Sequence, residues 1–404
     1  MPGRRRRIKL GKRFSADAMK RTGQRAFLAL ALLGLYLGPP LFMWQQVKVV
    51  RHAVSSASAT REISVLDYGA VGDGVTDDGA AFEAAFADAF KHGSPVLIPR
   101  RTYVINRPLK ITSGMVIRST GATLTHTDST IAILSARKAD AWVIQGPLTL
   151  SGTRTEKGQH DTETGLSLAG CSRYIVDKLS VTDFRGTGIR IAGKPEGKGS
   201  GRGDQGQYAF VSFRNNTVGL QIDEGTGAEY NLFTLLSFSG NETAARIVAG
   251  NNVISASNVV DNVGGLALTA GSNHGHGIFN AVNINHNKTF NVHAYNQLNG
   301  YTFSGCHVYG DSPTAGTVHL ERSNGVHFFG GIIGATVIND GGGTNVITNT
   351  FVPGPRFNVT GNNACSLYTD TLFDRDRMLT WADTHNALSH CTTPQPEPAR
   401  QRIQ

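Results

Sequence analysis

Titratable side chains recur in the middle and later parts of the chain, within short runs where apolar and polar residues alternate. Arg246 lies in the run AARIV, and His293 lies in FNVHA. His319 and Glu321 share the run TVHLE, and Asp223 ends an earlier run of the same kind. Such alternation is typical of a half-buried β-strand, so we expect these side chains to lie on the outward face of a sheet.

Two kinds of chemistry suit such groups. An inverting glycosidase needs two carboxyl groups about 6.5 to 9.5 Å apart, and neighbouring strands lie about 4.8 Å apart, so carboxylates one or two strands apart would serve. Asp223, Asp261 and Glu321 are the carboxylates available for this role. Elimination instead needs a base for the proton α to a uronate carboxylate and a cation that neutralises that carboxylate, roles that suit histidine and arginine. The candidate catalytic residues are Asp223, Arg246, His293, His319 and Glu321, and the candidates for substrate binding are Asn291 and His276.

The strands that carry these residues repeat along the chain. Asn241, Asn262 and Asn287 each follow one strand-like run and precede another, at spacings of 21 and 25 residues, and Asp311 follows 24 residues later. Each repeat holds strands that are too short to bury a face alone, and stacking in a solenoid buries them together. Crossovers between parallel strands are right-handed. The sequence therefore predicts an all-β fold, a right-handed single-stranded parallel β-helix.

Alternation also separates inward from outward residues. The expected inward residues are Ala245, Ile247, Leu266, Leu268, Phe290, Val292, Val318 and Leu320. The expected outward rows are first Arg246, Ala267, Asn291 and His319, and then Thr269, His293 and Glu321. The turn asparagines are expected to stack as an amide ladder inside the corners, because Asn tolerates the left-handed conformation and satisfies turn backbone.

A helix is predicted before the first strands. Phe82, Phe86 and Phe90 recur every four residues, which places them on one helical face. Thr76 or Asp77 can cap the start of this helix. Such a helix needs an apolar surface to cover.

The same region resembles a known family. The segments Val65–Asp78 (VLDYGAVGDGVTDD), Val96–Pro99 (VLIP) and Thr102–Ile105 (TYVI) closely resemble the N-terminal signature of the pectate lyase superfamily, in the group related to family 28 glycoside hydrolases. The resemblance implies that these residues form the N-terminal cap of a right-handed β-helix. It also implies action on an acidic or complex polysaccharide as a hydrolase, a lyase or an epimerase, or a role as a phage tailspike.

The catalytic pattern of polygalacturonases, which runs NTD, DD, GHG and RIK, is largely missing. Of that ordered pattern only Gly275-His276-Gly277 can be matched, and the single RIK, Arg7-Ile8-Lys9, lies in the basic N-terminal tail. That mechanism is therefore not transferred to this chain. The expected function is a glycoside hydrolase or polysaccharide lyase, with a polysaccharide epimerase or a non-catalytic glycan-binding or structural β-helix as alternatives.

The histidines and cysteines indicate neither a metal site nor a disulfide framework. His274, His276 and His286 lack the Cys/His spacing of a structural zinc site, and nothing in the sequence supports calcium, so no cofactor is expected. Four cysteines are too few for a disulfide scaffold. Either Cys365 and Cys391 pair, or all four cysteines are free thiols.

The charge of the chain is concentrated at its N-terminus. Residues 1–25 hold 10 Lys or Arg against one acid, Asp17, which accounts for the whole formal net charge of +9 and leaves the rest neutral. Nucleic-acid binding is therefore not expected. Residues 26–46 carry no formal charge and are long enough to cross a bilayer, with the basic tail kept in the cytoplasm. We expect a single-pass anchor in the inner membrane with an exported domain, and a signal peptide cleaved near Ala57-Ser58-Ala59 is the alternative.

These observations divide the chain into five parts. They are a basic cytoplasmic tail (1–25), a transmembrane signal anchor (26–46), a linker (47–62), the parallel β-helix (63–350) and a partly disordered C-terminal extension (351–404). The expected partners are a polysaccharide substrate and, through residues 26–46, a lipid bilayer.

Overall fold

The computed structural model describes residues 62–373 except residues 129, 157–161, 194–204, 224–227, 270–275, 297–299, 313, 341–344, 349–350, 353–366 and 370–371. The predicted tail, the predicted bilayer-spanning segment and both Cys365 and Cys391 lie outside the described residues. Within the described residues, no helix is both long enough and apolar enough to span a bilayer.

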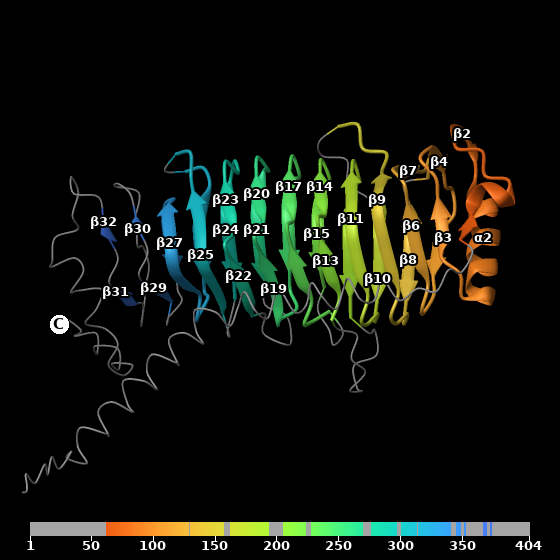
Figure 1. Cartoon of the computed structure of the whole chain (residues 1–404). Helices are drawn as coiled ribbons and strands as arrows, with labels where there is room; N and C mark the ends of the chain where they lie inside the picture. The colour runs from red at the N-terminus through yellow and green to blue at the C-terminus, as the bar shows by residue number, and fades with distance from the viewer. Residues whose placement is uncertain are drawn as a thin grey trace, which may run out of the picture. The chain divides into compact units, whose positions relative to one another are not determined.

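Parallel strands form nearly all of the described structure, and they stack side by side along the solenoid (Figure 1). One sheet has ten strands, each hydrogen-bonded to the equivalent strand of the next coil; Leu166, for example, pairs with Leu134 on one side and Ile189 on the other. The predicted right-handed parallel β-helix is confirmed. The ten strands, in spatial order, are β5 (Leu109–Ile111), β8 (Ala132–Arg137), β10 (Thr164–Ala169), β12 (Thr187–Ala192), β15 (Val218–Ile222), β18 (Thr243–Ile247), β21 (Gly264–Thr269), β24 (Phe290–Tyr295), β26 (Thr317–Glu321) and β28 (Val337–Asp340).

The second sheet has 22 strands and is bent along its length. Long strands of one coil pair with two shorter strands of the next, as β11 does with β13 and β14. Phe210, Leu235, Ala256 and Ala281 lie between such short strands with positive φ angles of 48 to 56°, a conformation that turns the chain. The strands are β1 (Ile63–Ser64), β2 (Asp73–Asp77), β3 (Val96–Ile98), β4 (Thr102–Val104), β6 (Val116–Ser119), β7 (Ala122–Thr125), β9 (Val143–Ser151), β11 (Ile175–Thr182), β13 (Gln207–Ala209), β14 (Ser212–Arg214), β16 (Leu232–Thr234), β17 (Ser237–Ser239), β19 (Asn252–Ser255), β20 (Asn258–Val260), β22 (Gly277–Asn280), β23 (Asn283–Asn285), β25 (Tyr301–Tyr309), β27 (His327–Gly334), β29 (Val346–Thr348), β30 (Phe351–Val352), β31 (Leu367–Thr369) and β32 (Leu372–Phe373).

The interior of the coil is filled by stacks of like side chains. Because equivalent residues of successive coils are in register, Phe279, Phe303 and Phe328 stack with ring centroids 4.7 and 4.6 Å apart. All the predicted inward residues are buried except Phe290, which is half-buried. Cys171 and Cys306 are buried free thiols in this interior, and burial raises the pKa of Cys306 to about 11.

The predicted amide ladder is present at one corner. The side-chain amide of Asn216 donates to the Oδ1 of Asn241 at 2.9 Å, Asn241 donates to Asn262 at 2.9 Å, and Asn262 donates to Asn287 at 3.0 Å. All four side chains are buried, so each hydrogen bond replaces one that water would otherwise make. The ladder continues through Asn287 to Asn291, at 2.8 Å.

Asp311, which comes next in the same spacing series along the sequence, is not part of the ladder. It is exposed, and one of its carboxylate oxygens lies 2.7 Å from Nδ1 of His286. A second ladder that the sequence did not reveal joins Asn231 to Asn252 at 3.0 Å.

The predicted helix is α2 (Gly79–His92), which follows a short 3-10 helix, η1 (Val65–Tyr68). Phe82 and Phe86 are buried against the first strands, whereas Phe90 is 60% exposed. The helix begins one or two residues later than the caps Thr76 and Asp77 suggested, since Asp78 occupies the N-cap position and its carboxylate accepts hydrogen bonds from the preceding loop. Asp77 accepts a hydrogen bond from the N–H of Gly79, the first helical residue, at 3.0 Å.

The parallel ladder continues beyond the predicted boundary at residue 350. Strand β30 pairs with β27 and β32, and strand β31 pairs with β29. The coil therefore includes described residues as far as Phe373.

Candidate functional site

The outward face of the ten-stranded sheet carries one row of polar and charged residues. Backbone register places Arg190 beside Gln221, Gln221 beside Arg246, and Ala267 between Arg246 and His293. His319 follows His293 on the next strand. We call this set the charged row: Arg190, Gln221, Arg246, Ala267, His293 and His319.

The C-terminal end of the charged row holds a compact group of three titratable residues, the His–Glu cluster: His293, His319 and Glu321. The two imidazole rings are stacked, with centroids 5.0 Å apart and planes inclined by 11°. Nε2 of His293 lies 3.2 Å from Oε2 of Glu321. Since a carboxylate only accepts hydrogen bonds, Nε2 carries the proton in this contact and Nδ1 of the neutral ring is the basic nitrogen.

Two further residues flank the His–Glu cluster. Tyr295 lies beside Glu321 on the neighbouring strand, and the guanidinium of Arg322 lies 4.7 Å from the centre of the Tyr295 ring. Arg322 also lies 3.7 Å from the other carboxylate oxygen of Glu321, Oε1. The His–Glu cluster and its flanking residues therefore bring two imidazoles, one carboxylate and one guanidinium together at a partly exposed surface.

The N-terminal end of the charged row is organised by Asp223. One oxygen of its carboxylate accepts a hydrogen bond from Nε of Arg190 at 2.6 Å, and the other accepts from the side-chain amide of Gln221 at 2.5 Å. Arg246, two strands farther along than Arg190, is exposed, and its side chain makes no hydrogen bond or ion pair with the rest of the described chain. Arg246 is thus the cation of the row that is open to an anionic ligand.

The prediction that Asn291 faces outward with Arg246 and His319 is wrong. The pairing between β24 and β26 shifts by one residue between Phe290 and Val292, so Phe290 is half-buried and Asn291 is turned inward. The Asn291 side chain is fully buried and donates to the carbonyl oxygens of Tyr309 and Gly316. The same shift moves His293 into the row of Arg246, whereas the sequence placed it in the row of Glu321.

His276 and Asp261 lie away from the charged row. His276 precedes β22 of the other sheet, and its Nε2 lies 2.7 Å from Oδ1 of Asn251. Asp261 lies in a corner with a φ of 60°, next to the amide ladder. Gly275, the first residue of the GHG sequence, is outside the described residues. The row therefore includes Arg246, His293 and His319 with the adjoining Asp223 and Glu321, but not Asn291 or His276.

The distance between Asp223 and Glu321 tests whether these two carboxylates form an inverting pair. Asp223 follows β15 and Glu321 ends β26, which is four strands away in the sheet. At about 4.8 Å per strand their backbones are about 19 Å apart, well beyond the 6.5 to 9.5 Å of an inverting pair. These two carboxylates cannot act together on one glycosidic bond.

Asp177, on β11, is a candidate that the sequence analysis missed. It lies on the outward face of the 22-stranded sheet, in register with Gln145 and Ala209. Burial raises the pKa of its carboxyl, and the neighbouring Lys178 opposes that effect. A carboxyl with a raised pKa suits a general acid. The alternation of apolar and polar residues in IVDKLSVT indicates that the Asp177 side chain faces outward, but only the folded structure shows that it is partly buried.

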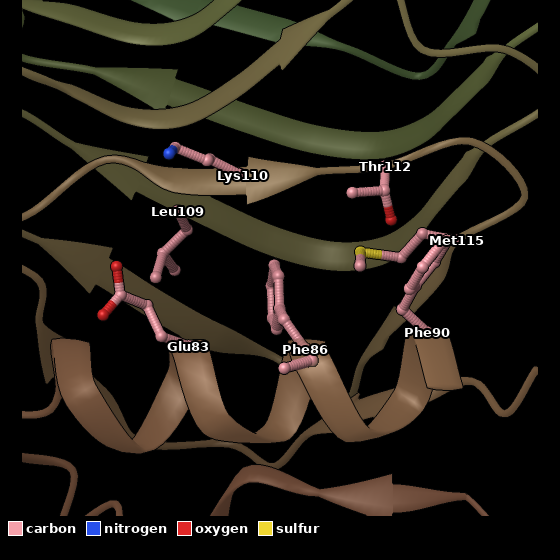
Figure 2. Close-up of a pocket in the computed structure, with 8 residues that line it drawn as sticks. Glu83, Phe86, Phe90, Leu109, Lys110, Thr112 and Met115 are labelled. Carbon is pink, nitrogen blue, oxygen red and sulfur yellow. The ribbon is translucent and has the colours of Figure 1, made fainter. Parts of the chain in front are cut away.

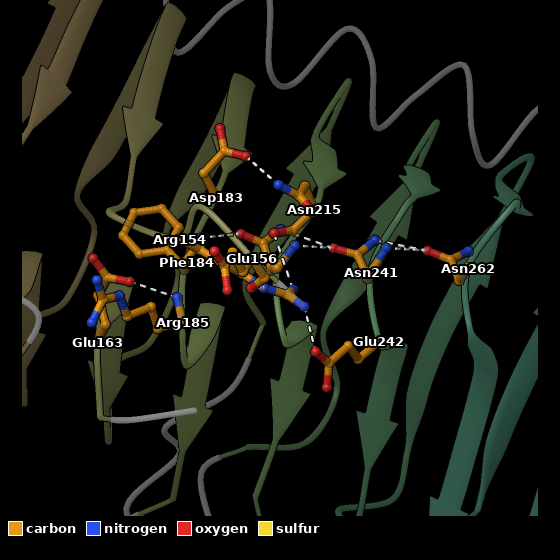
Figure 3. Close-up of polar contacts among 11 residues, drawn as sticks. Arg154, Glu156, Glu163, Asp183, Phe184, Arg185, Asn215, Asn241, Glu242 and Asn262 are labelled. Atoms are coloured by element: carbon orange, nitrogen blue, oxygen red, sulfur yellow. Dashed lines mark hydrogen bonds and ion pairs between the residues drawn. The ribbon is translucent and has the colours of Figure 1, made fainter. Parts of the chain in front are cut away.

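A buried group of charged residues lies near the N-terminal end of the amide ladder (Figure 3). His126 and Glu163 are ion-paired at 2.7 Å with both side chains fully buried. Arg154 donates to the backbone oxygen of Asn215 and is ion-paired with Glu242. Because the His126–Glu163 pair and the Arg154 side chain are enclosed, we assign them to the structure of the corner and not to a reaction with a polymer.

A pocket of about 330 Å³ lies between α2 and β5 (Figure 2). Phe86, Leu109 and Met115 line it together with the exposed Phe90, and Glu83 and Lys110 are its only charged lining residues. The apolar lining suits an apolar group better than a hydrated sugar chain. The pocket is therefore not assigned to polysaccharide binding.

Comparisons with known proteins agree with the fold. A family model described as "Rhamnogalacturonase A/epimerase, pectate lyase-like" matches residues 62–292. The pre-neck appendage protein of Bacillus phage phi29 is 29% identical over 144 residues, which cover 32% of this chain and 16% of that protein. The pre-neck appendage protein of Bacillus phage B103 is 47% identical over 70 residues, which cover 17% of this chain and 8% of that protein. The matches thus span less than a fifth of these relatives.

Two solved structures resemble the solenoid. The A-module of the mannuronan C-5 epimerase AlgE6 from Azotobacter vinelandii has a TM-score of 0.58 and 16% identity, covering 77% of this chain and 99% of that one. The N-terminal fragment of bacteriophage phi29 gene product 12 has a TM-score of 0.52 and 16% identity, covering 82% and 73%. At these identities the likeness concerns the fold alone.

Proposed function

Because this chain belongs to the rhamnogalacturonase A/epimerase, pectate lyase-like family, we propose that it binds an acidic polysaccharide along the charged row and abstracts the proton α to a uronate carboxylate. Elimination or epimerisation follows from that step. The observation that carries the proposal is the register that places Arg246, His293 and His319 on one outward row.

The row suits a polyanion because its cationic and imidazole groups recur at a regular distance. Arg190, Arg246 and His293 occupy every second strand, which separates their backbones by about 9.6 Å. A long sugar chain that runs across the coils would present successive carboxylates to these positions. Arg190 is already paired with Asp223, so Arg246 supplies the main attraction.

In this proposal His293 acts as the base. The carboxylate of Glu321 accepts a hydrogen bond from Nε2–H of His293. This contact orients the ring and leaves Nδ1 free to accept the proton of the substrate. Arg246 neutralises the uronate carboxylate and stabilises the negative charge that develops as the proton leaves. In elimination the electron pair then expels the glycosidic oxygen at the neighbouring carbon, and that oxygen leaves with a proton from water. In epimerisation water instead returns a proton to the opposite face of the carbon.

Hydrolysis by Asp223 and Glu321 is less well supported, because their backbones are about 19 Å apart. A different class of function, glycan binding without turnover, is favoured by the absence of the NTD and RIK sequences from residues 47–404, where the DD sequence occurs only as Asp77-Asp78 at the start of α2. The phage appendage proteins among the relatives fit such a role as well. Both functions use the same surface.

Product analysis on a panel of acidic polysaccharides separates these functions. Elimination gives an unsaturated product that absorbs in the ultraviolet, epimerisation changes the stereochemistry of the uronates without shortening the chain, and hydrolysis gives new reducing ends without ultraviolet absorbance. Binding without any product supports the non-catalytic function. If the protein neither binds nor alters any acidic polysaccharide, the proposal is wrong.

We also propose that residues 26–46 anchor the protein in the bacterial inner membrane and that the β-helix is exported. This proposal is supported by the uncharged apolar segment, which directly follows a 25-residue stretch that contains ten basic residues. In that location the protein would process an exopolysaccharide as it leaves the cell.

A further inference from the structure

We propose that the His–Glu cluster is a binding site for a divalent transition metal ion, with Zn²⁺ as the best match. Imidazole nitrogens and a carboxylate oxygen are the ligands of many zinc sites in which three protein groups leave one position open. His293, His319 and Glu321 each offer one such ligand atom, and these atoms lie within 4.8 Å of one another. The sequence analysis named these three residues as candidates but not as metal ligands, because they come from two strands that only the fold brings together.

The distances within the cluster fit such an ion. Zinc bonds of about 2.0 to 2.1 Å at a tetrahedral angle separate two ligand atoms by about 3.3 Å. Nε2 of His293 and Oε2 of Glu321 are already 3.2 Å apart. The third ligand, from His319, has to approach by no more than about 1.5 Å, which a small rotation of one side chain provides.

The backbone holds the ligands in place. His293 lies on β24 and His319 on β26, directly opposite each other in the parallel ladder, and Glu321 follows two residues later on the same face. The intervening Ala294 and Leu320 are buried in the core, which fixes the direction of their neighbours. About a third of the side-chain surface of His293 and Glu321 is exposed, so a water molecule or a ligand can occupy the open position.

One charge beside the cluster opposes cation binding. Arg322 lies 3.7 Å from Oε1 of Glu321, although its guanidinium also stacks on Tyr295 and faces the carboxylate oxygen that is not directed at His293. This positive charge lowers the affinity for a cation without blocking Oε2. Arg322→Gln should therefore increase the affinity for the metal ion, an effect that a simple His–Glu ion pair does not predict.

The inference does not depend on the proposed reaction, because metal binding is measured without a polysaccharide. It has one consequence for that reaction. An ion bound by Nε2 of His293 and by Glu321 would break the hydrogen bond that sets the tautomer of His293. Excess Zn²⁺ should therefore inhibit the proposed reaction. If the protein catalyses no reaction, its binding of Zn²⁺ is still measurable.

The test is calorimetric titration of the chelator-treated, tag-free protein with Zn²⁺, together with the visible absorption spectrum of the Co²⁺-loaded protein. We expect one site per chain and a Co²⁺ spectrum of low coordination number. His319→Ala, Glu321→Gln and the double variant His293→Ala/His319→Ala should each weaken binding by about 100-fold or more, since even outer partners of metal ligands contribute about 10- to 100-fold.

His286→Ala is the matched control. His286 and Asp311 form an exposed His–carboxylate pair at 2.7 Å with no third ligand near it among the described residues. This variant should keep the wild-type affinity for Zn²⁺. Circular dichroism verifies that each variant is folded. If the wild-type protein takes up no Zn²⁺, or if the double variant binds it as tightly as the wild type, the cluster is an ion pair only and the inference is wrong.

Discussion

His293 stacks face to face on His319, with ring centroids 5.0 Å apart, because the two residues are directly paired across adjacent strands β24 and β26. This contact places two imidazoles at one end of the charged row, with the carboxylate of Glu321 beside them. The proposed reaction and the proposed metal site both depend on this arrangement, and they predict different effects of the same substitutions.

His293→Ala should lower the rate of product formation by about 10²-fold or more, since it removes the proposed base. Glu321→Gln should have a smaller effect on the rate, because the amide can still contact the ring while its charge is lost. Thermal unfolding should show little change, as substitutions at such partly exposed positions usually alter stability by about 0.5 kcal/mol. Full activity of both variants would place the reaction on another face of the β-helix, where Asp177 is the next residue to test.

Arg246→Ala should weaken the binding of acidic polysaccharide several-fold, because the exposed guanidinium attracts the polyanion. The affinity of the variant should also depend less on the salt concentration than that of the wild type. Arg246→Lys should retain part of the affinity. Arg214→Ala is the control, since Arg214 is an exposed arginine on β14 of the other sheet. Equal losses for Arg246→Ala and Arg214→Ala, measured by affinity electrophoresis at several salt concentrations, would contradict binding along the charged row.

Asn262→Ala should destabilise the β-helix by about 2 to 3 kcal/mol. The substitution removes the side-chain hydrogen bonds that join Asn262 to Asn241 and to Asn287, and it leaves the buried backbone N–H of Asn241 without its acceptor. Asn258→Ala, at an exposed position on β20, should change stability by no more than about 0.5 kcal/mol. Denaturant unfolding of the two variants measures the difference, and similar values would show that the ladder adds no stability.

The buried Glu163 predicts a loss of stability in acid. Burial alone would raise the pKa of this carboxyl, but the close contact with His126 and the hydrogen bond from the backbone N–H of Arg185 outweigh burial and bring the pKa below its usual 4.5. Because the pKa is lower in the folded state, the contribution of Glu163 to stability is present above pH 4.5 and is lost as the pH falls through the folded-state pKa.

Glu163→Gln tests this prediction by unfolding measurements across the acidic range. The variant should be less stable at neutral pH by about 3 kcal/mol, because His126 loses its buried partner. Its stability should also change less than that of the wild type between pH 6 and pH 3. The exposed Glu83→Gln should leave the pH profile unchanged. Parallel pH profiles for wild type and Glu163→Gln would mean that another group controls acid unfolding.

The anchor proposal predicts that a C-terminal reporter active only outside the cytoplasm is active in a fusion to the full chain, and that the fusion stays with membranes after an alkaline carbonate wash. Replacing three leucines, Leu30, Leu32 and Leu35, with Asp should abolish both results, because each charge opposes insertion into the bilayer. A soluble, processed form that starts near Thr60 would establish a cleaved signal peptide instead.

The sequence by itself determined the solenoid, because the signals for it are local and repeated. The asparagines at spacings of 21 and 25 residues mark the corners, and two-residue alternation separates core from surface within each strand. These signals correctly placed Leu266, Val318 and Leu320 inside and Arg246 and His319 outside. A period that is repeated over many coils averages out local irregularity, which is why the fold could be predicted without coordinates.

Only the tertiary structure decided which side chains meet. The one-residue shift between Phe290 and Val292 turns Asn291 inward and brings His293 into line with His319, and alternation cannot reveal a shift that depends on how β24 pairs with β26. Arg154 reaches Glu242, a residue 88 positions away, through a corner that exists only when the coils are stacked. Ion pairs, buried carboxyls and metal ligands depend on such contacts between coils, and the sequence of one coil does not contain them.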